Sequence, residues 1–299
     1  MMHKKRRVMM IYKKMLIAIS CIALRSVYCV QYNFSSEPID VVIPCIQKDQ
    51  RTLDLAIAGI KENGKNIRKI YIISPQQLSD QAMWIDEKIF PFTKTDIALV
   101  MFKGDKKQAD NYIHNKKTRI GWIYQQLIKL YAPLIIPGIS QNVLMLDADT
   151  IFMNPVEFQA PDGAALFNPG TEYHKPYFEQ AERVVPGFKK IFRGYSGIAH
   201  HMLFQRPILV DLLQAIRKAC GNLEPWVALV QNISERDFFE SGLSEYELYF
   251  NFAFQQTDQV KLRFLKWKNS PSLKKWKKDK ACGYHYVAYH VYTTNSGQY

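Results

Sequence analysis

The chain has 299 residues, of which 47% are hydrophobic and 22% are charged, and this composition excludes a disordered or low-complexity protein. The length suits one large α/β domain. The formal net charge is +13, but no recognition module accompanies the basic residues, so we predict that the protein binds no nucleic acid.

Residues 1–35 are predicted to be a leader rather than part of the fold. Seven basic residues precede the first acid, Glu37, and flank an apolar stretch over 15–24. That stretch has the length of a signal-peptide core and is shorter than a membrane span. A cleaved signal and an uncleaved membrane anchor both fit. We therefore expect a membrane-associated or secretory protein, with the side of the membrane left open.

Apolar runs alternate with helical patterns after the leader. The runs are short, end at Pro or a polar residue, and have no polar alternation, as in buried parallel strands. Apolar residues at helical spacing follow the first run and end at Gly64, a helix stop. This alternation predicts a doubly wound, mostly parallel sheet flanked by helices. We predict strands over 40–45, 69–74, 97–102 and 143–146, and helices beginning near 53 and 120.

The pattern changes in the second half of the chain. Strands are predicted over 164–167 and 197–204, and helices over 207–220 and 244–256. The chain beyond 258 is basic and aromatic without a clear period. Three cysteines lie outside the leader, and their odd number and spacing argue against a disulfide framework and a zinc site. We expect them to be mostly buried thiols.

Two carboxylates, Asp147 and Asp149, follow the apolar run 143–146. Ligands of open α/β sheets bind outside the carboxyl ends of the strands. Two carboxylates there repel each other unless a cation lies between them. Nucleotide-sugar transferases and phosphohydrolases share such a D-x-D pattern, and in the latter the first Asp is a nucleophile. Because no glycine-rich phosphate loop is present, a nucleotide would be held by a metal and by side chains.

Several blocks, taken in order, resemble a known group of enzymes. They are 42–44 (Val-Ile-Pro), 119–126 (R-x-G-W-x-x-Q-Q), 146–149 (L-D-A-D), 197–202 (G-I-A-H-H-M), 244–247 (S-E-Y-E) and 289–290 (Y-H). The set resembles GT-A-type glycosyltransferases, and in particular an uncharacterised, mainly bacterial family of predicted nucleotide-sugar transferases. The resemblance covers roughly 40–295. It implies a GT-A-like α/β domain over 36–299, with a nucleotide-binding half (36–155) and a mixed C-terminal acceptor half (156–299).

The resemblance also implies a donor site for a nucleotide-diphosphate sugar, UDP-sugar being the expected type. Mn²⁺ or Mg²⁺ would be held by Asp147, Asp149 and a histidine near the C-terminus. Position 290 fits that histidine best and His285 is the alternative, although His290 could instead pack among the aromatic residues around it. Carboxylate oxygens suit both metals, and an imidazole favours Mn²⁺. The nucleotide would contact Pro44, Asp49, Arg119 and Asp147.

The acceptor side is expected to lie in the 244–247 block. Glu245 is the candidate general base. Ser244 and Glu247 form a capping-box pattern, so Glu247 is expected to be structural as well as near the acceptor. His200 and His201 alternate on a predicted strand, so at most one of them faces the acceptor.

Basic side chains could offset the charge that develops on the leaving group. Arg119, Lys129 and the basic cluster over 261–280 are the candidates, and we expect Lys129 to be an exposed helix residue. The basic segments could also contact an acidic membrane surface.

The predicted reaction is metal-dependent transfer of a sugar to a hydroxyl group of a glycan, lipid or protein. A phosphohydrolase is one alternative, but such enzymes carry the D-x-D on their first strand and need a later lysine and acidic pair. A non-enzymatic exported sugar-binding protein is the other, and the leader favours it.

Overall fold

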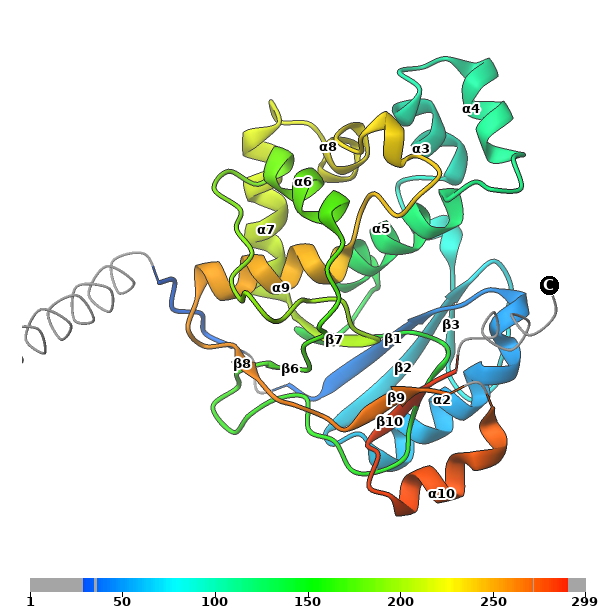
Figure 1. The fold of residues 1–299 in the computed structure, drawn as a ribbon, viewed down its shortest axis with the longest axis vertical. Helices are drawn as coiled ribbons and strands as arrows, with labels where there is room; N and C mark the ends of the chain where they lie inside the picture. Colours follow the sequence, from blue (N-terminus) through cyan, green and yellow to red (C-terminus); the bar gives the residue numbers. More distant parts are fainter. Residues whose placement is uncertain (1–28, 35–36, 271, 290–299) are drawn as a thin grey trace, which may run out of the picture.

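A five-stranded sheet in the order β3-β2-β1-β4-β7 forms the centre of the molecule (Figure 1). The computed structural model describes residues 29–34, 37–270 and 272–289. Strands β1, β2, β3 and β4 are parallel, and β7 runs antiparallel to β4 at the edge. The strands are β1 (Ile39–Pro44), β2 (Ile67–Ser74), β3 (Met83–Asp86), β4 (Asn142–Leu146) and β7 (His201–Gln205).

The central strands are buried on both faces, which explains their unbroken apolar sequences. Every residue of β1 and β4 is buried, and Val42 pairs with Tyr71 on one side and Met145 on the other. Parallel pairing brings the carboxyl ends of β1, β2 and β4 to one edge of the sheet. Pro44, Ser74 and Leu146 therefore mark the edge at which a ligand is expected.

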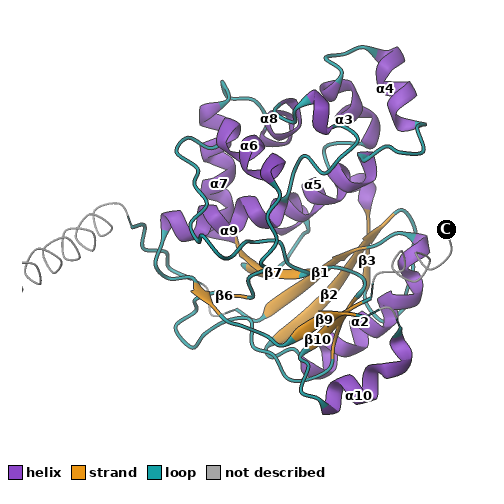
Figure 2. Ribbon diagram, in the orientation of Figure 1, coloured by secondary structure: helices purple, strands orange, loops and turns teal. Residues whose placement is uncertain are grey.

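Helices cover both faces of this sheet (Figure 2). On one face α5 packs on β1, and α7 packs on β7; α9 packs against both helices. On the other face α2 packs against β2 and β5. The helices of this layer arrangement are α2 (Gln50–Asn63), α5 (Ile120–Ile135), α7 (Arg206–Ala219) and α9 (Glu245–Gln256).

A small sheet in the order β5-β10-β9 lies beside the D-x-D motif. Strand β10 pairs antiparallel with β5 and parallel with β9, with Ala288 opposite Thr150. The C-terminal part of the chain therefore returns to the segment that follows Asp149. The strands are β5 (Thr150–Phe152), β9 (Trp267–Asn269) and β10 (Tyr286–Ala288), and a separate pair joins β6 (Leu166–Phe167) to β8 (Lys261–Leu262).

The remaining helices are α3 (Lys94–Met101), α4 (Lys106–Ile113), α6 (Lys175–Val184), α8 (Pro225–Gln231) and α10 (Trp276–Ala281). Four of them, α3, α4, α6 and α8, lie beyond α5, α7 and α9, and α10 lies on the opposite side of the molecule beside α2 (Figure 1). Short 3-10 turns cover η1 (Gln47–Asp49), η2 (Glu87–Ile89), η3 (Glu235–Asp237) and η4 (Leu273–Lys275).

The predicted strand over 97–102 is wrong, because this segment belongs to helix α3. Thr93 caps the helix, and its side chain and that of Asp96 bond each other's backbone N–H groups in a capping box. Ile97, Ala98 and Met101 are buried at helical spacing. The next parallel strand is instead β3, which the sequence did not indicate because it has four residues and a largely exposed edge.

The predicted α/β class, with a mostly parallel sheet flanked by helices and a mixed C-terminal half, is confirmed. The predicted helix stop at Gly64 is also confirmed, and the helix predicted over 207–220 ends before Gly221, whose positive φ of 66° favours glycine. The strand predicted over 197–204 is shorter, since pairing begins at His201.

The cysteines differ from their predicted burial. All described cysteines are free thiols, as their number and spacing indicate, but Cys45 is buried while Cys220 is half-buried and Cys282 is exposed.

Most of the predicted leader, 1–28, lies outside the described residues. Among the helices of the described ranges, none combines the length and the apolar sequence needed to cross a membrane.

We predict that Gly59→Ala destabilises the protein although alanine is the better helix former. A Cβ at Gly59 would lie 2.6 Å from the Phe152 carbonyl oxygen, so α2 would have to move away from β5. Urea unfolding should show a loss of about 1–3 kcal/mol. The matched control is Gly121→Ala in α5, where a Cβ meets nothing within 4 Å and stability should hold or rise. Equal stability of the two variants would contradict the close packing of α2 on β5.

Candidate functional site

The D-x-D motif follows β4 in a tight turn at the carboxyl edge of the sheet. The Asp147 N–H donates to the His200 carbonyl at 3.0 Å, and the Asp147 carbonyl accepts from Thr150 N–H at 3.0 Å. The chain then enters β5. Both carboxylates are half-buried, and the Asp149 carbonyl accepts from Tyr289 N–H at 2.8 Å. The turn is therefore fixed by β7 on one side and by the C-terminal segment on the other.

Lys129 of α5 is buried between two carboxylates. Its side chain is 3% exposed, and its Nζ lies 2.6 Å from Asp147 Oδ1 and 2.7 Å from Glu245 Oε1. The same Nζ lies 4.2 Å from the centre of the Tyr246 ring, within cation–π range. The expectation of an exposed Lys129 is therefore wrong. The lysine joins α5, the end of β4 and the start of α9.

The charges of this trio are strongly coupled. Burial alone would lower the pKa of Lys129, but the Asp147 and Glu245 carboxylates raise it well above its usual value, so the ammonium stays charged. Burial raises the pKa of Glu245, and the Lys129 charge offsets only part of that effect. With both carboxylates ionised the trio carries one net negative charge, which favours a further cation next to it.

The two glutamates of the 244–247 block have different surroundings. Glu245 is 1% exposed and contacts Lys129, so it is not the freely accessible carboxylate that the sequence suggested. Ser244 caps α9 by accepting from Glu247 N–H at 3.2 Å, as predicted. The Glu247 carboxylate accepts from Gly197 N–H at 2.8 Å and from the Asn251 amide at 2.8 Å. Glu247 thus links the 197 loop, the segment 197–200 that leads into β7, to helix α9.

His200 and His201 have different neighbours. The Nδ1 atom of His200 is 4.0 Å from Asp147 Oδ2, and its ring contacts Trp267 with 4.9 Å between centres. His201 is 2% exposed, and both of its ring nitrogens lack a hydrogen-bond partner among the described residues. Its ring is surrounded by the rings of Phe152, Phe158 and Tyr286. Of the pair, His200 is therefore the one beside the D-x-D.

A pocket of about 300 Å³ opens at the carboxyl ends of β1 and β2. It contains three of the predicted nucleotide contacts, Pro44, Asp49 and Arg119, together with Gly121 at the start of α5. Arg119 donates to Ser241 Oγ at 2.6 Å and its guanidinium lies 5.0 Å from the Trp122 ring. The helix start and Arg119 make this end of the pocket favourable for an anion.

Burial and nearby acidic groups raise the pKa values of two residues that line this pocket, Asp49 and Cys45. Burial and then the Asp149 charge raise the pKa of Asp49, which Lys48 partly offsets. Burial raises the pKa of Cys45 to about 12, so it is a neutral thiol at physiological pH. The influence of Asp149 on both groups links the D-x-D electrostatically to the pocket.

The residues present suit a hard divalent cation. Asp147 contacts Lys129 through Oδ1 rather than through Oδ2. Asp149, two residues later in the same turn, is partly exposed. Across residues 29–34, 37–270 and 272–289, no three His, Cys, Asp or Glu side chains cluster as a ready-made metal site. Mg²⁺ is commonly held by one or two carboxylates and by substrate phosphates, so the two aspartates have the required chemistry.

The predicted histidine ligands are placed differently by the structure. His290 lies outside the described residues, so its role stays a prediction. The Nδ1 atom of His285 accepts a hydrogen bond from the Lys266 N–H at 3.1 Å. This contact of the His285 ring is not with the D-x-D turn. Three lysines of the 261–280 cluster are in ion pairs with carboxylates: Lys261 with Asp162, Lys268 with Asp279 and Lys280 with Glu62.

Sequence reasoning missed the burial of Lys129, although a signal was present. It is the one charged residue in the 16-residue helix Ile120–Ile135. A helix that is apolar nearly all round is buried, and a lone charge in it must then find a partner. Lys94 and Glu87, which also line the pocket, had no recognisable pattern because they begin two separate elements, α3 and η2.

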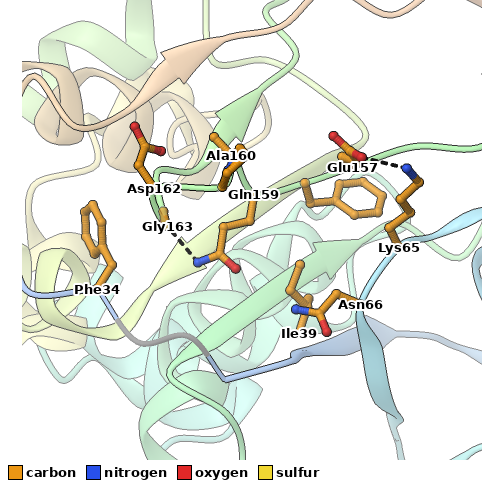
Figure 3. A pocket seen from close by; sticks show the side chains of 11 residues that line it. Phe34, Ile39, Lys65, Asn66, Glu157, Gln159, Ala160, Asp162 and Gly163 are labelled. Carbon is orange, nitrogen blue, oxygen red and sulfur yellow. Dashed lines mark hydrogen bonds and ion pairs between the residues drawn. The ribbon is translucent and has the colours of Figure 1, made fainter.

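A second pocket, of about 520 Å³, lies at the opposite edge of the sheet (Figure 3). Ile39, the first residue of β1, lines it, so it is not at the carboxyl ends of the strands. Lys65 pairs with Glu157 at 2.6 Å, and Gln159 donates to the Gly163 carbonyl (Figure 3). Asp162, which also lines it, pairs with Lys261 outside the pocket, and none of the predicted site residues lies in it.

We predict that Lys129→Met strongly destabilises the protein. The variant leaves Glu245 and Asp147 close together without the ammonium between them, and loss of one partner of a buried pair costs about 3–5 kcal/mol. Urea unfolding measures this loss. Adding Glu245→Met should recover part of it, while Lys218→Met on the exposed face of α7 should change stability by less than about 0.5 kcal/mol. Wild-type stability in Lys129→Met would contradict the buried pairing.

We predict that His201→Phe reduces the loss of stability in acid. Burial, and then the positive charges of Arg263 and His200, hold the pKa of His201 well below 6.5. Below that pH the unfolded chain binds a proton that the folded chain does not. The free energy of unfolding therefore falls by about 1.4 kcal/mol per pH unit from this group.

Urea unfolding above and below pH 6.5 should show a shallower acid slope for His201→Phe than for the wild type. The control is Phe158→Leu, which alters the same ring cage without changing a titratable group, so its acid slope should match that of the wild type. An unchanged slope in His201→Phe would mean that His201 is protonated in the folded protein.

Comparison with known proteins gives a family and a distant structural likeness. No curated protein matches the chain. Among solved structures, the apo crystal structure of mouse xyloside xylosyltransferase 1 is similar with a TM-score of 0.43 and 12% identity, over 85% of this chain and 99% of that one. A TM-score of this size does not by itself establish a common fold.

The family match spans the whole five-stranded sheet and the site residues from Pro44 to His285. It runs over residues 37–285, from the start of β1 to the end of the loop before β10. The chain belongs to the family described as "Family of unknown function (DUF6492)".

Proposed function

We propose that the protein is a metal-dependent, GT-A-like glycosyltransferase that moves a sugar from a nucleotide-diphosphate sugar to an acceptor hydroxyl. The observation that carries the proposal is the placement of the D-x-D turn and the 300 Å³ pocket at the same edge of the sheet. A nucleotide in that pocket would have its phosphates near the start of α5 and near Asp147 and Asp149. The resemblance of the ordered sequence blocks supports the same reading.

The donor would be bound by groups of the first half of the chain. The nucleoside fits between the ends of β1 and β2 and the aromatic residues of α5, and Trp122 and Tyr124 line that space. Arg119 and the N–H groups at the start of α5 suit the diphosphate. A UDP-sugar remains the expected donor, and Pro44 and Asp49 remain its expected contacts.

Asp147 and Asp149, with His290 as a third ligand, are proposed to hold Mn²⁺ or Mg²⁺. Tyr289, the neighbour of His290 in sequence, is hydrogen-bonded to Asp149, which supports that choice. When bound, the metal would supply positive charge to the diphosphate leaving group. The protein's part is to fix the carboxylates, and the contact with Lys129 holds Asp147 in one orientation.

In the transfer, a bond forms between the acceptor oxygen and the anomeric carbon while the bond from that carbon to the donor phosphate breaks. The proton of the acceptor hydroxyl must be removed. Glu245 was the predicted base, but its burial against Lys129 gives that role no geometric support. We propose instead that Glu245 positions Lys129. His200, beside Asp147, and Glu247, on the 197 loop, remain candidates for the acceptor side.

The acceptor is proposed to be a glycan, lipid or protein reached by a membrane-associated or secretory route. This rests on the basic, apolar leader and on the lysine-rich segment near α10. Four lysines of that segment are exposed and make no salt bridge with a residue that the structure describes, which suits an acidic membrane surface: Lys274, Lys275, Lys277 and Lys278.

We predict that UDP with Mn²⁺ stabilises the protein and that Asp149→Ala abolishes this effect without unfolding the domain. A ligand at 100 times its Kd adds about 2.7 kcal/mol to the free energy of unfolding. Urea or thermal unfolding with UDP, Mn²⁺, both or neither measures it. Asp149 is the better residue to change, because replacing Asp147 also leaves Lys129 without one of its two carboxylates.

Two results would contradict the proposed function. One is the absence of Mn²⁺-dependent stabilisation by every nucleotide diphosphate tried. The other is release of inorganic phosphate from simple phosphoesters that disappears in Asp147→Asn, since this would identify a phosphohydrolase nucleophile.

A further inference from the structure

A third hollow, of about 520 Å³, lies between two loops of the C-terminal half, 171–174 and 189–195. We propose that it binds an acidic oligosaccharide, as the acceptor subsite of the enzyme. This inference rests on the proposed function. The hollow is lined by Thr171, Tyr173, Lys190, Ile191, Arg193 and Gly194.

Exposed aromatic rings gather around this hollow. Tyr173 is 61% exposed and Phe264 is 61% exposed, and Tyr195 contacts Phe264 with 5.3 Å between ring centres. Exposed rings that are grouped on one surface, rather than scattered singly, are a mark of binding sites. The rings are supported from behind, because Tyr173 stacks on Phe178 at 5.2 Å. Fixed, open ring faces suit the C–H faces of sugar rings.

Two basic side chains in the hollow have no acidic partner. Neither Lys190 nor Arg193 makes a salt bridge with any residue of the described ranges. Lys190 donates to the Tyr195 carbonyl at 2.9 Å and lies 5.3 Å from the Tyr173 ring, so its charge is held at the aromatic surface. Glu172 belongs to the same loop but does not line the hollow. An arginine and a lysine that make no salt bridge within the described ranges favour a carboxylate or phosphate group on the sugar.

Two chain segments connect the hollow with the D-x-D. One runs from Tyr195 to His200, which lies 4.0 Å from Asp147. The other runs from Phe264 to Trp267, whose ring contacts His200 at 4.9 Å. Three residues of extended chain span at most about 11 Å, so the backbone of Phe264 lies within that distance of Trp267, which contacts His200 beside the D-x-D turn. An oligosaccharide on the aromatic rim could therefore present its end to the donor.

The test measures binding of trigalacturonate, galactotriose and tripolyphosphate to the full chain by calorimetry, with UDP and Mn²⁺ binding measured on the same samples. Trigalacturonate should bind at least about tenfold more tightly than galactotriose or tripolyphosphate. Arg193→Gln should weaken it about tenfold, and Phe264→Ala should weaken it about three- to tenfold. Lys218→Gln and Trp276→Ala, which change an exposed cation and a 45%-exposed ring outside the hollow, are the matched controls.

Each other result overturns a specific claim. Equal affinity for trigalacturonate and galactotriose would show that Lys190 and Arg193 do not recognise the acidic groups. Equal affinity for tripolyphosphate and trigalacturonate would show that the site binds any anion and does not recognise a sugar. Unchanged binding in both Arg193→Gln and Phe264→Ala would place the ligand elsewhere. Because these side chains are exposed, all variants should keep the wild-type urea midpoint. Absence of trigalacturonate specificity with intact UDP and Mn²⁺ binding contradicts this inference and leaves the proposed function standing. Specific trigalacturonate binding without UDP and Mn²⁺ binding contradicts the proposed function, and with it the acceptor role of the hollow, but not the binding of an acidic sugar there.

Discussion

The buried contact of Lys129 with Asp147 and Glu245 is the constraint on which the candidate site depends. It joins α5, the end of β4 and the start of α9 at a single ammonium group. A buried pair of this kind is weak evidence for stability, since an apolar replacement of similar volume often serves as well. Its effect here is geometric. With Oδ1 of Asp147 fixed by Lys129, the direction in which the other oxygen points is set by the fold rather than by the ligand.

Helix α5 contributes to both the pocket and the D-x-D turn because of this contact. Its first turn lines the pocket at the ends of β1 and β2, and its middle holds Asp147. One rigid element therefore sets the distance between the proposed nucleotide position and the proposed metal position. The same arrangement explains why a nearly uncharged helix keeps one lysine: the charge has a partner on each side, and the net negative charge that remains favours a cation at the turn.

The parts of the structure that the sequence predicted well are those set by local pattern. The apolar run before Asp147 and the capping of α9 by Ser244 depend on neighbours in sequence. The burial of Lys129 depends on Glu245, 116 residues away, and the ring cage around His201 on rings 43 to 85 residues away, and no local period records such partners. The strand predicted over 97–102 was wrong for another reason. The β-type composition of this segment was outweighed by the capping box of Thr93 and Asp96, which starts a helix.

The two halves of the candidate site are built from different kinds of structure, and this affects how specificity could change. The nucleotide side rests on strand ends and on α5, whose residues are tied into the core through Lys129. The proposed acceptor side rests on loops 171–174 and 189–195, and its rings and cations are exposed. Substitutions in such loops cost little stability, whereas substitutions around Lys129 disturb three elements at once. A change of acceptor is therefore open to this fold without a change in how the D-x-D is held.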